Sequence, residues 1–377
     1  MKVMPDTSLY INLRDLKENI DAVKSLKSVK NKTVIAVIKS DAYGHGLIPV
    51  AKTLSDNGIN FFGIIYMEEA EAILKNIPKA KLLLLRGVAE SDIAEAINLN
   101  LSISAISLEY LHILLSKAKT LKKSVNIHIK FDSGMNRLGL SGDEMKSAID
   151  IIRKNKDFIN TEGFFSHLSS AGNDMEYTNF QLANYKKALS LLHSEGIKPL
   201  YTHISASSSL LNDKIDEDYS NAVRPGISIY GINPNLNYTG YSHVNLNPLM
   251  TVESSVMQIK KVKKGAFVSY NNTYRANNDM VIAIVPAGYD NGIPRLLSNK
   301  GRFLINDKFA KIIGIITMNT TMIDVTKIEG VKPGDRVIIA GKDASNKIAP
   351  QEIAQLAQTI PYEICLNFGK SNKKIYR

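Results

Sequence analysis

Cysteine is nearly absent from this sequence. The single cysteine, Cys365, excludes an internal disulfide and a cysteine-rich metal site, and it is typical of a chain that works in a reducing compartment. The N-terminal segment lacks the apolar core and the small-residue cleavage site of a secretory signal. The sequence therefore predicts a cytoplasmic protein with no metal site.

Long apolar runs and blocks of like charge are missing as well. The longest apolar run, around residues 280–287, is far shorter than the roughly 18 residues that indicate a membrane-spanning helix. The net charge is +11, but the basic residues are scattered, as in Lys117, Lys119, Lys122 and Lys123, and form no patch with aromatic residues. We therefore expect neither a membrane nor a nucleic acid as a partner. The positive balance mainly favours solubility and the attraction of anionic ligands.

The composition is that of an ordinary globular protein. Of the 377 residues, 44% are hydrophobic and 22% are charged, a balance that excludes collagen, a coiled coil and a disordered chain. The length exceeds the roughly 250 to 300 residues at which a single hydrophobic core stops growing. Two domains are therefore predicted.

Short β-rich runs alternate with helical segments through the first 230 residues. The helical segments carry apolar residues at helical spacing, as in residues 108–115 and 182–192. Strands that alternate with helices pair in parallel, and eight such units predict a closed (β/α)8 barrel, an α/β fold. The eight runs begin at Val34, Phe61, Leu82, Leu101, Val125, Glu162, Pro199 and Ala222, and the last one extends to Tyr230.

The pattern changes after Gly231, where a stretch rich in Asn, Pro and Tyr indicates a connector. Beyond it, β-rich runs separated by Gly, Asn and Asp predict a mainly antiparallel β domain with one short helix at residues 350–357. We predict that the barrel occupies residues 10–236 and the β domain residues 237–377. Residues 1–9 are predicted to pack with the β domain.

Polar residues with reactive side chains follow the predicted barrel strands. In barrels of this kind the catalytic groups lie at the C-terminal ends of the strands and in the loops after them. Residues from different strands would therefore share one pocket. The residues at these positions are Lys39 and Tyr43 after the first strand, Arg137 after the fifth, His167 at the end of the sixth, Ser207 after the seventh, and Arg224 and Gly226 in the eighth.

Lys39 differs from an ordinary lysine in its surroundings. A lysine after an apolar strand is usually a solvated loop charge. Here Gly44 and Gly46 allow the backbone to approach a ligand closely, and Asp41 is placed to cap the next segment of the chain. A lysine amine in such a site condenses with an aldehyde if burial or a neighbouring cation lowers its pKa. The sequence therefore predicts a Schiff base between Lys39 and pyridoxal 5′-phosphate (PLP).

The motif AVIKSDAYGHG, which contains Lys39, resembles the cofactor-binding signature of the alanine racemase family, a fold-type III group of PLP-dependent enzymes. Other motifs are similar to the family pattern and keep its order across nearly the whole chain. The resemblance implies an amino acid racemase that interconverts L- and D-alanine and supplies D-alanine for cell-wall peptidoglycan. These other motifs begin at His128, Phe164, Val223, Val268, Val285, Met318 and Pro361.

The resemblance also implies roles for individual residues. Lys39 and Tyr270 correspond to the two bases, one on each face of the substrate Cα, that racemisation requires. His167 and Arg224 correspond to a hydrogen-bonded chain toward this tyrosine and the pyridine nitrogen. An arginine donor keeps that nitrogen unprotonated and so suppresses other PLP reactions.

Further positions correspond to cofactor and substrate contacts of the family. Arg137 corresponds to an arginine near the phenolic oxygen of the cofactor and the substrate carboxylate. Lys130 corresponds to a lysine that is carbamylated in some relatives and orients that arginine. The residues that would hold the phosphate are Tyr43, Ser207, Gly226, Ile227 and Tyr362.

The resemblance implies a homodimer with shared active sites, because Tyr289 and Met318 correspond to substrate-binding residues that come from the second subunit. The sequence departs from the family at this entrance. The family commonly has Met-Asp where this chain has Met318-Asn319, and Ala-Asp where it has Asp290-Asn291. Because Asn319 carries no charge, we expect weaker attraction between this region and the ammonium group of the substrate.

Other functions remain open on the same PLP chemistry. These are racemisation of serine or of a basic amino acid, and a β-lyase reaction on a substrate such as cystathionine. Tyr362 favours a small side chain if it narrows the pocket. A decarboxylase is disfavoured, because Cys365 lies within a racemase-like motif. A non-catalytic PLP-binding protein is the non-enzyme alternative, and both Tyr270 and the second domain count against it.

Overall fold

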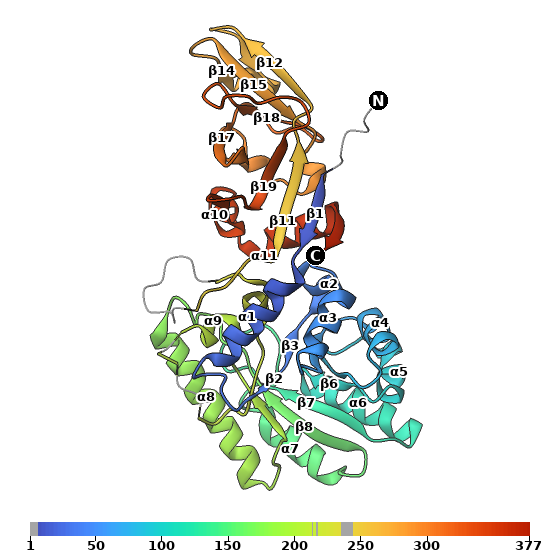
Figure 1. Cartoon of the computed structure of the whole chain (residues 1–377). Coiled ribbons are helices and arrows are strands. Elements are labelled where there is room, and N and C mark those ends of the chain that lie inside the picture. Colours follow the sequence, from blue (N-terminus) through green and yellow to red (C-terminus); the bar gives the residue numbers. More distant parts are fainter. Residues whose placement is uncertain (1–6, 213, 216–217, 235–243) are drawn as a thin grey trace.

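The computed structural model describes residues 7–212, 214–215, 218–234 and 244–377. Figure 1 shows a barrel domain, coloured mainly blue to green, and an elongated β domain, coloured mainly yellow to red and including the blue strand β1, that extends from one end of it. The predicted boundary between residues 236 and 237 lies outside the described residues. No helix in the described parts of the chain is long and apolar enough to cross a bilayer.

The barrel strands lie where the sequence predicts them. Seven of the eight predicted runs form one parallel sheet, in the order β3-β4-β5-β6-β7-β8-β9. The strands are β2 (Thr33–Val34), β3 (Ala36–Val37), β4 (Phe61–Ile64), β5 (Lys81–Leu84), β6 (Ser102–Ala105), β7 (Val125–Lys130), β8 (Ile159–Phe165), β9 (Tyr201–His203) and β10 (Ala222–Val223).

β10 closes the barrel between its first and last strands. On one side it pairs in parallel with β2, so that Ala222 lies opposite Thr33. On the other side the backbone N–H of Arg224 donates to the carbonyl of Ser205 next to β9, at 2.9 Å. The predicted (β/α)8 barrel is therefore confirmed as a ring of eight strand positions.

The helices of the barrel domain bury one apolar face each. In α6, Leu111, Leu114 and Ala118 are buried, as the spacing predicts. Asn12 and Ser107 cap α1 and α6 by accepting hydrogen bonds from backbone N–H groups. The helices are α1 (Leu13–Ser25), α2 (Lys39–Tyr43), α3 (Leu47–Asp56), α4 (Met67–Asn76), η1 (Glu90–Asp92), α5 (Ile93–Asn98), α6 (Leu108–Leu121), α7 (Glu144–Lys154), α8 (Met175–Ser194), α9 (Ser207–Leu210) and η2 (Ile227–Tyr230).

Two predictions about individual elements are wrong. The eighth β-rich run does not continue to Tyr230, because the chain turns after Val223 and forms the short helix η2. Pro225 has no backbone N–H for a sheet, and Gly226 has a φ of −124° and a ψ of −97°, which no strand uses. The β domain also contains a second helix, α11 (Pro361–Ser371). The sequence feature that indicates the start of this helix is Pro361 at the first helical position.

The second domain is a largely antiparallel sheet. Its strand order is β12-β15-β18-β17-β16-β19-β11-β1-β21, and β20 pairs with β19. Its elements are β1 (Ser8–Ile11), β11 (Met250–Ser255), β12 (Gln258–Val262), β13 (Phe267–Val268), η3 (Tyr270–Asn272), β14 (Tyr274–Arg275), β15 (Met280–Val285), η4 (Tyr289–Asn291), η5 (Arg295–Leu297), β16 (Arg302–Ile305), β17 (Lys308–Ile312), β18 (Thr321–Asp324), β19 (Arg336–Lys342), β20 (Lys347–Ile348), α10 (Pro350–Leu356), α11 and β21 (Lys373–Tyr376).

Strand β1 precedes the barrel in the chain but belongs to the sheet of the second domain. It is antiparallel to β11, with Leu9 opposite Val252, and parallel to β21, with Leu9 opposite Lys374. Leu9 and Ile11 are fully buried. In sequence terms, the barrel is therefore inserted between two neighbouring strands of one sheet.

Candidate active site

A cavity of about 580 Å³ lies at the C-terminal ends of the barrel strands. The strand-end rule predicted this location. The cavity brings together ten of the predicted site residues, which come from five strand ends and from α11. These residues are Lys39, Tyr43, Lys130, Arg137, His167, Ser207, Arg224, Gly226, Ile227 and Tyr362.

Lys39 is followed by a turn of left-handed backbone. Residues 40–43 all have φ angles between 52° and 55°, although none of them is glycine. This conformation costs roughly 1–2 kcal/mol per residue relative to the right-handed one. Four consecutive residues of this kind are a strained element, and such strain is found mainly at functional sites.

Hydrogen bonds from several elements hold the left-handed turn. The carboxylate of Glu69, buried in α4, accepts from the backbone N–H of Ser40 at 2.5 Å. Asp41 accepts from the N–H of Leu47 at 2.7 Å, which confirms that Asp41 caps the helix after it. The Nδ1 atom of His45 lies 3.0 Å from the carbonyl oxygen of Ala42. The sequence did not reveal Glu69, because a glutamate in the first turn of a helix usually serves only as a helix cap.

The surroundings of Lys39 favour the neutral, nucleophilic form of its amine. Burial lowers its pKa, and the positive charges of Arg137 and Arg86 lower it further, whereas Glu69 raises it. The neutral amine is the form that attacks an aldehyde. Arg86 also lines the cavity, and the sequence analysis missed it although it follows β5 closely.

One wall of the cavity requires a glycine. A Cβ atom at Gly226 would lie 2.8 Å from Tyr43 Oη, so any side chain there would collide with the phenol. The N–H of Gly226 donates to Ser207 Oγ at 2.9 Å, and the N–H of Ser228 donates to the same oxygen at 3.1 Å. Ile227 begins η2, where backbone N–H groups lack intrahelical partners. This cradle of hydroxyl and N–H groups fits a phosphate.

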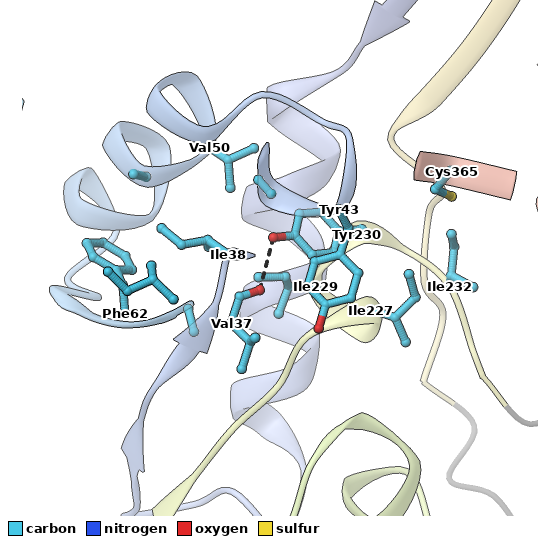
Figure 2. Packing of buried hydrophobic residues seen from close by; sticks show 14 of the residues in the cluster. Val37, Ile38, Tyr43, Val50, Phe62, Ile227, Ile229, Tyr230, Ile232 and Cys365 are labelled. Carbon is cyan, nitrogen blue, oxygen red and sulfur yellow. Dashed lines mark hydrogen bonds between the residues drawn. The ribbon is translucent and has the colours of Figure 1, made fainter. Parts of the chain in front are cut away.

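The tyrosines of this wall pack as a group. The ring of Tyr43 lies 5.1 Å from that of Tyr230 and 5.8 Å from that of Tyr362. Figure 2 shows Tyr43 beside Tyr230, whose hydroxyl donates to the carbonyl of Val37 at 3.1 Å. Burial raises the pKa of Tyr43, and it raises the pKa of Tyr362 to about 12. Both phenols therefore stay protonated and can donate to an anion.

Helix α11 packs directly on the turn after Lys39. A Cβ atom at Gly44 would lie 2.6 Å from the carbonyl oxygen of Cys365, and one at Gly369 would overlap the carbonyl oxygen of Gly44. The two glycines therefore allow backbone contact between the domains. This contact positions Tyr362 of the second domain on the wall of the barrel cavity.

Arg224 is buried at the floor of the cavity. One of its Nη atoms donates to the carbonyl of Ser166 at 2.6 Å, and the other lies 2.5 Å from Nδ1 of His203. His167 Nδ1 lies 3.3 Å from Arg224 Nη2. Burial and then the positive charge of Arg224 lower the pKa of His167, so this imidazole is neutral at pH 7.

Lys130 is also buried, at the end of β7. Burial lowers its pKa to about 7, and the charges of Arg224 and Arg137 contribute to the shift, which Asp132 opposes. Its amine lies 4.7 Å from the ring centroid of Phe165. A large fraction of this lysine is therefore uncharged near neutral pH.

The remaining predicted residues lie elsewhere on the chain. Tyr270, Tyr289 and Met318 line a separate hollow in the second domain, together with Asn319. The exposed fractions are 66% for Tyr270, 43% for Tyr289 and 54% for Met318. Large exposed side chains that lie together are typical of interaction surfaces. Within one chain, the two predicted bases are therefore not in the same cavity.

The entrance residues carry a charge that the sequence analysis overlooked. Asn319 Nδ2 lies 3.5 Å from a carboxylate oxygen of Asp290, so a negative charge remains next to the uncharged position. Arg295 lines the same hollow. No group of three His, Cys, Asp or Glu side chains in the described parts of the chain is arranged to hold a metal ion.

Comparison with known proteins matches both domains. The N-terminal domain of alanine racemase matches residues 11–234, and the C-terminal domain of alanine racemase matches residues 249–376. This chain belongs to the alanine racemase family. The family resemblance inferred from the motifs is thereby confirmed, and with it the prediction of an enzyme of the isomerase class.

Curated alanine racemases match over nearly their full length. The alanine racemase of Borreliella burgdorferi (strain B31) is 34% identical over 369 residues, which cover 98% of this chain and 96% of that protein. The alanine racemase of Geobacter sulfurreducens is 32% identical over 376 residues, which cover 98% and 97%.

Solved structures of the alanine racemase family have the same fold. The enzyme from Streptomyces lavendulae has a TM-score of 0.91 and 26% identity, covering 100% of this chain and 98% of that one. The enzyme from Bartonella henselae, which contains covalently bound PLP, has a TM-score of 0.88 and 25% identity, covering 99% and 100%. The cofactor prediction is thus confirmed at the level of the family.

Proposed function

We propose that this chain is a PLP-dependent racemase that interconverts L- and D-alanine. The observation that carries the proposal is the cavity at the barrel strand ends. It joins a lysine with a lowered pKa, a glycine-walled cradle for a phosphate and a buried arginine. The product D-alanine would serve cell-wall peptidoglycan, and the enzyme would act in the cytoplasm.

The residues of the cavity fit PLP at each end of the molecule. Lys39 would hold the aldehyde carbon, and the cradle around Gly226 would hold the phosphate with Tyr43, Ser207 and Tyr362. Arg224 remains protonated at all relevant pH values and can only donate, so it would leave the pyridine nitrogen without a proton. Bound PLP withdraws electrons from the substrate Cα and so acidifies its Cα–H bond.

Two bases then move the proton between the faces of Cα. In one direction the Lys39 amine removes it and the phenol of Tyr270 returns one to the opposite face, and in the other direction the roles are exchanged. Arg137 would bind the substrate carboxylate. Lys130, whose amine is largely neutral near pH 7, would add CO2 with loss of one proton, and the resulting anion would orient Arg137.

The separation of the two proposed bases within one chain supports a homodimer. Lys39 lines the barrel cavity, whereas Tyr270, Tyr289 and Met318 are exposed in a hollow of the second domain. We propose that a second copy of the chain covers the barrel cavity with this hollow. Each active site would then contain Lys39 of one subunit and Tyr270 of the other.

The proposed reaction can be tested with the purified protein. An absorbance band of lysine-bound PLP should be present, and L-alanine in D2O should exchange its Cα hydrogen and lose chirality. L-serine, L-lysine and cystathionine are the competing substrates. Pyruvate release from cystathionine without inversion of alanine would favour a β-lyase, faster inversion of serine or lysine would change the substrate, and a protein with neither band nor exchange would not be an enzyme of this kind.

The carboxylate beside Asn319 leads to a prediction about substrate binding. We expect Asp290→Asn to raise the KM for alanine about threefold, because exposed charge interactions are worth up to about 1 kcal/mol. Asn319→Asp should change the KM less, because Asp290 already supplies a negative charge there. Steady-state kinetics of both variants at low salt are the measurement. Unchanged kinetics for Asp290→Asn would remove the entrance charge from the account of substrate binding.

A further inference from the structure

The interior of the barrel contains a chain of polar side chains that begins at Arg224 and leads away from the cavity. Arg224 Nη1 lies 2.5 Å from His203 Nδ1, and His203 Nε2 lies 2.9 Å from His128 Nδ1. His128 Nε2 lies 3.3 Å from Oε2 of Glu162. Both imidazoles are fully buried. Barrel interiors are dominated by Val, Ile and Leu, so a connected series of polar side chains is unusual there.

The series of hydrogen-bonded side chains ends at Glu162, on the opposite side of the barrel from the cavity. Glu162 contacts the side chains of Lys81 and Ser102, which are the first residues of β5 and β6. The N-terminal ends of the barrel strands lie on this side. The hydrogen-bonded chain therefore crosses the barrel from one end to the other.

Both ends of the chain impose the same direction on its hydrogen bonds. Arginine only donates, so His203 Nδ1 accepts and the proton of this imidazole sits on Nε2. That N–H donates to Nδ1 of His128, which places the His128 proton on Nε2, facing Glu162. An ionised carboxylate only accepts. Every bond therefore runs from Arg224 toward Glu162.

The charge states agree with this direction. Burial alone would raise the pKa of Glu162, but hydrogen bonds from His128, Lys81 and Ser102 outweigh it and lower the pKa to about 2. Burial lowers the pKa of His128 and that of His203. Two neutral imidazoles thus lie between a buried cation and a carboxylate, and each bond of such a series polarises the next.

We propose that Glu162 is a positioning residue for Arg224, acting through His128 and His203 from the opposite end of the barrel. The negative charge of Glu162 makes His128 a better acceptor for His203, and His203 in turn a better acceptor for Arg224. The guanidinium is thereby held in one orientation at the floor of the cavity. This inference rests on the proposed function, in which Arg224 faces the cofactor.

The first test observes the tautomers of the wild-type holoenzyme. Nitrogen-15 NMR with labelled histidine distinguishes protonated from unprotonated ring nitrogens, and assignments come from single His→Gln variants. We expect His128 and His203 to have unprotonated Nδ1 and protonated Nε2 at pH 7. A proton on Nδ1 of either residue, or a charged imidazole, would overturn the proposal without any need for a Glu162 variant.

The second test compares Glu162→Gln with Lys81→Met. The Glu162→Gln substitution keeps the shape of the side chain but removes its charge. Lys81→Met removes a different contact of Glu162 and keeps all four side chains of the hydrogen-bonded series from Arg224 to Glu162. We expect Glu162→Gln to lower kcat about tenfold to a hundredfold, which is the usual effect of losing a residue that orients a ligand-contacting side chain through hydrogen bonds. KM should change less than about twofold. The nitrogen resonances of His203 should shift in the same variant.

Lys81→Met should leave kcat within about twofold of the wild type and the His203 resonances unchanged. A Glu162→Gln protein with normal kcat and normal His203 resonances would reduce Glu162 to a purely structural residue, whatever its thermal stability. If the wild type fails to racemise any amino acid, the proposed function fails. The tautomer spectrum would still report on the hydrogen-bonded chain.

Discussion

We expect two inactive variants of this chain to restore racemase activity when they are combined in one dimer. Lys39→Ala would remove the proposed cofactor anchor and one proposed base, and Tyr270→Phe would remove the other proposed base. Each variant alone should lose at least about a hundredfold in kcat, because a positioned acid or base contributes roughly 10²- to 10⁴-fold. In a mixed dimer with shared sites, one site would combine Lys39 of one subunit with Tyr270 of the other and would be intact.

The measurement requires co-expression with two different affinity tags and purification of the mixed dimer. If sites are shared, this dimer should have about half of the wild-type activity, because one of its two sites is complete. The matched control is a dimer of a wild-type chain with a chain that carries both substitutions. Shared sites make this control inactive, whereas sites built within one chain would give the control half the activity and the first dimer none.

The stability of this protein should increase with pH because of Lys130. Its pKa is about 7 in the folded state and 10.5 in the reference state. Between these values the unfolded chain binds more protons than the folded one, so raising the pH favours folding. From pH 7 to pH 9 the free energy of unfolding should rise by roughly 2–3 kcal/mol from this residue alone.

Lys130→Met should remove that rise and be more stable than the wild type at pH 7. Chemical denaturation at several pH values in CO2-free buffer measures both quantities. The control is Lys146→Met, which replaces an exposed lysine of α7 and should preserve the pH dependence. Parallel curves for wild type and Lys130→Met would contradict the prediction. A stabilisation of the wild type by bicarbonate that Lys130→Met lacks would identify the carbamate.

The sequence was informative wherever function depends on strand ends. Lys39, Arg137 and Arg224 were found because reactive residues follow barrel strands, and the structure brings them into one cavity. The same rule also points to Arg86, which follows the third barrel strand. Glu69 was not found, because its position in the first turn of a helix suggests a helix cap and not a contact with the turn after Lys39.

Other features depend on contacts that a linear sequence does not contain. His128 lies within an alternating β run, and alternation does not say whether its side chain faces the barrel interior or the helices. The left-handed turn after Lys39 contains no glycine at residues 40–43, so residue preferences alone argue against it. Contacts with Glu69 and α11 override those preferences. The separation of Tyr270 from Lys39 likewise appears only in three dimensions.

The placement of β1 between β11 and β21 determines the order in which this chain can be completed during translation. The ribosome releases β1 first, then the entire barrel, and β21 only after all other strands of that sheet. Domains form as units during synthesis, so the barrel can close before β11 and β21, the strands that pair with β1, have been synthesised. Tyr362 emerges only shortly before β21. The nascent barrel therefore has Lys39 before Tyr362 joins the proposed phosphate cradle, and full cofactor affinity is expected only once α11 has been synthesised and has packed on the barrel.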